Sequence, residues 1–285
     1  YRPMPVLNYP GSLILTVPRQ EGISERILLD FSSRFAPMGS IDPISRKQAA
    51  FFFDTEAPYF EPLDPVLWER GLVDRQYRLT VRDDRSATIE GQYVYDYLYD
   101  RQIREALTNP EVKQRLADSQ LAGDLRGIQI EKSDLQDMED IKKPPRLTFT
   151  GVIPDIVKSK DERTLTLSPV LVRSEAASIV AEPTRQFPME FDTSLQWNPL
   201  DIRLDLSGWI EKGAAVYFPE DTVMITEFGF YSLYYEWYND NVVLRRSFLI
   251  PKQKIEPEAY SRFVDFCRII DQVEDRDILI TLPSS

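Results

Sequence analysis

The residues that could carry catalytic chemistry in this chain are few, and one common type is missing. Its 285 residues include no histidine and a single cysteine, Cys267. Serine and cysteine nucleophiles are usually activated by a neighbouring histidine, and many zinc sites use imidazole as a ligand. The composition therefore excludes Ser–His and Cys–His catalysis, and every histidine-containing zinc site, within this chain.

Cys267 lies in a segment whose spacing predicts an amphipathic helix at about residues 256–271. Pro257 falls in its first turn, and apolar side chains recur on one face: Tyr260, Phe263, Val264, Cys267 and Ile270. A cysteine within such a face usually behaves as a small hydrophobic residue. We therefore interpret Cys267 as a core residue and not as a nucleophile.

An acidic cluster offers a possible site for a hard cation such as Ca²⁺. Asp134, Asp137, Glu139 and Asp140 fall within seven residues of one another. Their spacing does not match a known calcium loop, and no glycine permits the sharp turn that such a loop needs. We interpret the cluster as a solvated loop, and we expect no metal and no cofactor.

Aromatic residues gather in residues 227–238, which predict one long strand. Tyr231, Tyr235 and Trp237 share one face and are candidate ligand-binding residues for a sugar or a peptide. The opposite face is also apolar, which favours a central strand packed on both sides. Exposure of these three rings would separate the two interpretations, because a buried ring cannot contact a ligand.

The charge balance restricts the partners. There are 34 basic and 46 acidic residues, a formal net charge of −12, so nucleic acid and anionic membrane surfaces are disfavoured. No apolar run approaches the length of a transmembrane helix. The first residues carry neither an initiator methionine nor a signal peptide, and we interpret the chain as part of a longer protein.

Alternating apolar residues predict a mainly β fold with a few helices. A hairpin is expected where Asp83, Asp84 and Arg85 separate two alternating segments, and a helical region at about 95–121 should break or restart at Pro110. The expected strands are 13–17, 26–30, 48–53, 77–82, 86–94, 126–130, 146–154, 227–238, 242–250 and 278–282.

The length of the chain and the positions of its turn-forming residues predict three regions. Residues 1–57 form an opening group of strands, and residues 58–157 form a β-rich domain with the helical insertion. Residues 158–285 form a β-sandwich-like domain that carries the terminal helix. We expect each of the two later regions to have its own sheets.

Residues 27–40 (ILLDFSSRFAPMGS) resemble a segment of bacterial transglutaminase-like proteins, in which a strand ends at an aspartate and an aromatic-Ala-Pro-x-Gly stretch follows. The resemblance implies that Asp30 matches the aspartate of a Cys–His–Asp triad. Ser12 then stands near the place of the histidine, and the cysteine would lie upstream. The end of the chain, residues 244–260, resembles the hairpin and helix that follow the core in such proteins.

This resemblance implies a degenerate transglutaminase-like core followed by two β-sandwich-like domains, in a protein of the periplasm or cell envelope. Asp30 and Ser12 are then vestigial positions, and the chain itself is not an enzyme. The leading hypothesis is a non-catalytic scaffold that binds other proteins within a larger assembly. Two alternatives stay open: the C-terminal part of an active cysteine transglutaminase or protease, and a carbohydrate-binding module.

Overall fold

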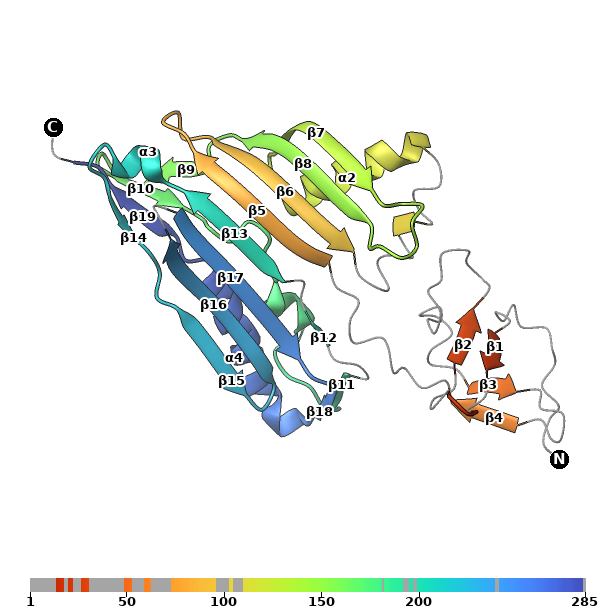
Figure 1. Ribbon diagram of the computed structural model, residues 1–285. Helices are drawn as coiled ribbons and strands as arrows, with labels where there is room; N and C mark the ends of the chain where they lie inside the picture. The colour runs from red at the N-terminus through yellow and green to blue at the C-terminus, as the bar shows by residue number, and fades with distance from the viewer. Residues whose placement is uncertain are drawn as a thin grey trace.

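The computed structural model describes residues 73–95, 103–104, 110–180, 182–191, 195–196, 199–238 and 241–283, with short stretches at 14–17, 20–22, 27–30, 49–52 and 59–62. The chain is mainly β, as the sequence predicts (Figure 1). Among the described residues, none of the helices is both long and apolar enough to traverse a lipid bilayer.

The opening region contributes two short antiparallel pairs. β1 (Ile14–Val17) pairs with β2 (Ile27–Asp30), and β3 (Ala49–Phe52) pairs with β4 (Tyr59–Pro62). β1, β2 and β3 fall within strands that apolar runs predict, whereas β4 lies in a segment where no strand is expected from the sequence. The transglutaminase-like arrangement proposed for this region concerns residues that lie largely outside the described ones.

A nine-stranded sheet organises the rest of the chain. Its order is β15-β16-β17-β13-β5-β6-β8-β7, and β12 also pairs with β17 (Figure 1). The strands are β5 (Val73–Val81), β6 (Ala87–Tyr95), β7 (Gln129–Gln136), β8 (Arg146–Ile153), β12 (Leu195–Gln196), β13 (Leu200–Asp205), β15 (Thr222–Thr226), β16 (Gly229–Tyr238) and β17 (Asn241–Ile250). The predicted hairpins β5–β6 and β16–β17 are both confirmed.

The parallel pairing of β13 with β5 joins the two later regions. Leu200 is level with Arg75, and Asp205 is level with Thr80. Strands from either side of residue 158 therefore hydrogen-bond within one sheet. The boundary expected at 157/158 was wrong as a division between separate sheets, because long-range parallel pairing leaves no local sequence signal.

One face of this sheet holds most of its buried residues in the described part of the chain. Residues alternate between buried and exposed along β5 and β17, and the exposed set includes Arg78, Thr80 and Arg245. On β16, Tyr231 and Leu233 point into the core, whereas Tyr234 and Glu236 are exposed. The expectation that β16 packs on both sides was therefore wrong. Tyr234 and Glu236 on its outward face end in polar atoms that water can solvate.

Helices and a small sheet cover the buried face. The helices are α2 (Pro110–Asp124), η3 (Ala176–Ile179), α3 (Ser207–Ile210) and α4 (Pro257–Glu274). The small sheet has the order β14-β19-β10-β9, from β14 (Ala215–Tyr217), β19 (Ile278–Thr281), β10 (Thr164–Leu167) and β9 (Val157–Ser159), and β11 (Met189–Phe191) pairs with β18 (Gln253–Ile255). α2 begins at Pro110, as predicted, and the apolar face expected for α4 is buried.

Two buried arginines in one row of the large sheet fix the ends of both long helices. The row runs Arg246, Leu200, Arg75 across three neighbouring strands. Arg75 pairs at 3.1 Å with Asp124, the last residue of α2, and Arg246 pairs at 3.2 Å with Glu274, the last residue of α4. A carboxylate at a helix C-terminus opposes the helix dipole, and each arginine compensates for it.

The Glu274 site is the more deeply buried of the two. Its carboxylate accepts hydrogen bonds from the Ser174 backbone N–H at 2.6 Å and from the Tyr231 hydroxyl at 3.3 Å. Arg246 also donates to the Val172 carbonyl at 2.7 Å. The side chains of Arg246 and Glu274 are 2% and 0% exposed, so neither charge has water as an alternative partner.

Replacing Glu274 with glutamine should destabilise the fold strongly. The amide keeps the shape but removes the negative charge, and Arg246 then stays buried without its counter-ion. Loss of one partner of a buried pair costs about 3–5 kcal/mol, measured as the free energy of unfolding in urea. Glu236→Gln is the control, because its pair with Arg245 is exposed and should contribute little. Equal effects of the two changes would contradict this role.

Gly91 should not tolerate a side chain. On the buried face it lies level with Phe149 of β8, and a Cβ atom at position 91 would collide with that ring. We expect Gly91→Ala to lower the free energy of unfolding by about 1–3 kcal/mol through overpacking. Gly123→Ala is the matched control: a Cβ there meets nothing within 4 Å, and alanine is the better helix former. If Gly91→Ala is neutral, the close approach of Phe149 is not a constraint.

Candidate functional site

The triad positions suggested by the resemblance are not brought together by anything described. Ser12 lies outside the described residues. Asp30 is the last residue of β2 and is level with Ile14 of β1; its side chain is outside the description. The suggested roles of Ser12 and Asp30 therefore stay predictions.

The three aromatic candidates differ in exposure. Tyr231 is fully buried and bonded to Glu274, so it cannot form part of a surface platform. Tyr235 is half-buried, and Phe218 lies against it with ring centroids 6.1 Å apart. Trp237 is 52% exposed, with Phe218 packed edge-on at 5.1 Å. Burial of Tyr231 thus leaves one open ring of the three, which does not make a flat sugar-stacking face.

Cys267 is in the core, as the helical spacing predicts. It is fully buried on the inner face of α4, and burial raises the pKa of its thiol to about 12. The reactive form of cysteine is the thiolate. At neutral pH the thiol of Cys267 is therefore both protonated and inaccessible.

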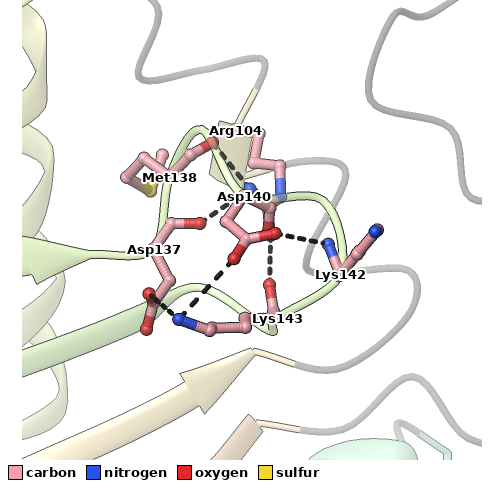
Figure 2. A network of polar contacts seen from close by, with 6 residues as sticks. All are labelled: Arg104, Asp137, Met138, Asp140, Lys142 and Lys143. Atoms are coloured by element: carbon pink, nitrogen blue, oxygen red, sulfur yellow. Dashed lines mark hydrogen bonds and ion pairs between the residues drawn. The ribbon is translucent and has the colours of Figure 1, made fainter.

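The acidic segment surrounds a positive group of the chain itself, the guanidinium of Arg104. Arg104 is 1% exposed, and its guanidinium donates to the backbone carbonyls of Asp137, Met138, Asp140 and Lys143 at 2.8, 2.6, 3.2 and 2.5 Å (Figure 2). Asp137 and Asp140 also face the Lys143 ammonium at 3.7 and 3.6 Å. The carbonyls that could have held a metal ion are thus occupied by arginine.

The predicted loop was also placed too early. Asp134 belongs to β7 and is level with Thr148 of β8, so the loop begins only at Asp137. Throughout the described part of the chain, no three carboxylate or cysteine side chains converge in a way that would hold a metal ion.

A cleft of about 710 Å³ lies where the C-terminal ends of α2 and α4 meet the segment before η3. Three of its acidic residues are engaged within the chain: Glu274 pairs with Arg246, Asp275 pairs with Arg173, and Asp271 accepts the backbone N–H groups of Ala176 and Ala177 at 2.7 and 3.0 Å.

The open margin of the large sheet at β15 has a different character. In the described part of the chain β15 pairs only with β16, which leaves the backbone groups of its other side without a neighbouring strand (Figure 1). Its five residues, Thr-Val-Met-Ile-Thr, include no charge and no proline. Charged residues and prolines normally protect the edge of a sheet, because an unprotected edge pairs readily with another chain.

Apolar side chains cover the solvent-facing side of this margin. Ile225 is 79% exposed, Val223 is 49% exposed and Tyr234 is 41% exposed. The register places Ile225 beside Phe230, and Phe230 beside Leu249, both half-buried. We call Val223, Ile225, Phe230, Tyr234 and Leu249 the edge patch. Further along the same face the sheet becomes polar, beginning with Arg245, which pairs with Asp201 and Glu236.

Acidic residues flank the edge patch along the chain. Glu220 and Asp221 precede β15 and Glu227 follows it. Two of the three are already engaged: Asp221 accepts the backbone N–H of Tyr235 at 2.8 Å, and Glu227 pairs with Arg262 at 2.9 Å. The unpaired strand edge is therefore apolar, and among the flanking carboxylates Glu227 has a counter-ion.

Sequence reasoning drew attention to the aromatic strand and not to the edge strand beside it. Tyr231 and Tyr235 face inward, whereas Tyr234 of β16 and Val223 and Ile225 of β15 face solvent. The available signal was the uncharged five-residue run at 222–226, one short turn before the long strand. Its position at the margin of the sheet is a matter of topology, which that run does not encode.

Comparison with known proteins gives one similarity. Residues 163–280 match the model of a family described as a domain of unknown function with a solved structure, DUF3858. The match runs from β10 to β19, which pair in the small sheet, and it includes β15 and α4. Neither curated proteins nor solved structures provide a match.

The buried thiol makes a direct prediction. In the folded chain Cys267 should resist alkylation between about pH 7 and 9, because its pKa of about 12 keeps the thiolate scarce and the core excludes the reagent. In the denatured chain the rate should rise through the ordinary thiol pKa near 8.5. Mass spectrometry of alkylated protein with and without urea measures this. Rapid labelling of the folded chain at pH 7 would reopen a chemical role for Cys267.

Proposed function

We propose that this chain is a non-catalytic protein-binding module whose β15 edge accepts an extended segment of another polypeptide. The open, uncharged edge strand, whose own Ile225 is 79% exposed, carries the proposal. Strand addition is an established mode of recognition in which backbone hydrogen bonds supply affinity and alternate side chains supply specificity.

The energetics suit such an interaction. Fully burying an isoleucine or valine side chain is worth about 1.5–3 kcal/mol. Ile225 and Val223 both point to the same side of the sheet, where a paired strand would place its own side chains beside them. The edge patch extends this contact over β16 and β17. Exposed apolar patches of this kind mark interaction sites on soluble proteins.

A non-catalytic role fits the composition. The chain has no histidine, and its one thiol is buried and has a raised pKa. The resemblance of residues 27–40 to transglutaminase-like proteins supports a place beside a degenerate core of that kind. We propose on the same basis a periplasmic or envelope location, where the module would serve as a scaffold within a larger assembly.

Selection from a random peptide display library tests the edge without a known partner. Against the wild-type chain we expect enrichment of extended peptides with alternating β-branched residues. Their affinity should fall about tenfold or more for Ile225→Lys, which removes the burial of isoleucine and introduces a charge at the edge.

Thr80→Lys is the matched control. It adds the same charge on the same exposed face, but on the central strand β5. Peptides should bind this variant as they bind the wild type. Enriched peptides that bind Ile225→Lys equally well, or no enrichment against a chain that is monomeric under the same conditions, would refute strand addition at β15.

A further inference from the structure

We infer that the segment accepted by the β15 edge is β15 of a second copy of this chain, paired antiparallel about a two-fold axis at Met224. The inference rests on the proposed use of this edge and adds the identity of its occupant. It follows from the pattern of β15, from its register with β16, and from the charges at its ends.

The sequence of β15 is nearly the same in both directions. It reads Thr222-Val223-Met224-Ile225-Thr226, with a threonine at each end and a β-branched aliphatic residue on each side of a central methionine. A two-fold axis at Met224 places Val223 opposite Ile225 of the second copy, and Thr222 opposite its Thr226. β-branched pairs and Thr–Thr pairs are both favourable across antiparallel strands.

The two-fold axis also preserves the faces of the sheet. Val223 and Ile225 are level with Ser232 and Phe230 and point to solvent, whereas Met224 is level with the buried Tyr231. Pairing Val223 with Ile225 keeps apolar side chains on the same side in both copies. A shift of one residue would set the exposed face of one copy against the buried face of the other.

Two-fold pairing doubles the apolar contact. Each Ile225 would meet a Val223 on the other side of the axis, and the two edge patches would become one continuous surface. Interfaces between identical chains are usually of this isologous kind, in which the same patch serves both partners. The two nine-stranded sheets would then continue into each other across the axis.

Charge at the ends of the strand opposes this pairing only in part. The axis sets Asp221 opposite Glu227 of the second copy. Glu227 is already paired with Arg262, and Arg276 reaches Thr222 of the same strand, with Nη1 3.4 Å from Oγ1. Arg262 thus offsets the charge of Glu227 at one end of β15, and Arg276 adds positive charge near Thr222 at the other.

Sedimentation equilibrium across the micromolar range gives the first test. We expect the wild-type chain and Thr80→Lys to form a concentration-dependent dimer. Ile225→Lys should dissociate at least tenfold more readily, because two lysines then face the axis. A wild-type chain that stays monomeric throughout this range, or a dimer unaffected by Ile225→Lys, would overturn the inference.

Disulfide trapping tests the register. The axis pairs position 223 with position 225, within the Cα separation that a disulfide spans, whereas 223 and 223 of the two copies are diagonal neighbours and lie further apart. An equimolar mixture of Val223→Cys and Ile225→Cys, distinguished by tags, should give severalfold more cross-linked dimer than either variant alone. Wild type is the control, because its only cysteine is buried. Equal yields from mixed and single variants would exclude this register.

The two proposals fail separately. If the chain is monomeric but displayed peptides bind in a manner that depends on Ile225, the β15 edge accepts a foreign strand and self-pairing is wrong. If the chain is monomeric and no peptide depends on Ile225, both the edge and its occupant are wrong.

Discussion

The structure depends on a single row of the large sheet, in which Arg246 and Arg75 flank Leu200 and each binds a carboxylate at the end of a helix. Glu274 ends α4 and Asp124 ends α2, so the two long helices are attached to neighbouring strands at comparable points. A buried charge without a partner costs several kcal/mol, which makes alternative placements of either helix unfavourable.

That row exists only because β13 lies parallel to β5. Without this pairing, the hairpin β5–β6 with its partners β7 and β8 would form one sheet, and β13 with β15–β17 another. The helices add further polar ties, such as the bond from Tyr95 to Gln120 at 2.8 Å. One continuous core then lies beneath a sheet whose opposite face is left to solvent.

The large sheet is open and ends in two edge strands, β7 and β15, which differ in character. β7 at one margin is rich in charge, with Glu131, Lys132 and Asp134, which discourages pairing with another strand. β15 at the other margin has no charge within the strand and exposes its own Ile225. The contrast directs attention to β15 as the margin through which the proposed module would contact another chain.

Sequence alone determined the local elements: the β5–β6 and β16–β17 hairpins, the start of α2 at Pro110 and the apolar face of α4 that buries Cys267. These follow from periodicity and turn chemistry, which act over a few residues. Only tertiary structure decided which face of the aromatic strand is buried, that residues on both sides of 158 share one sheet, and that β15 is left at a margin. Those outcomes depend on strand order, which is set by the joint burial of residues far apart in the chain and so has no local signature.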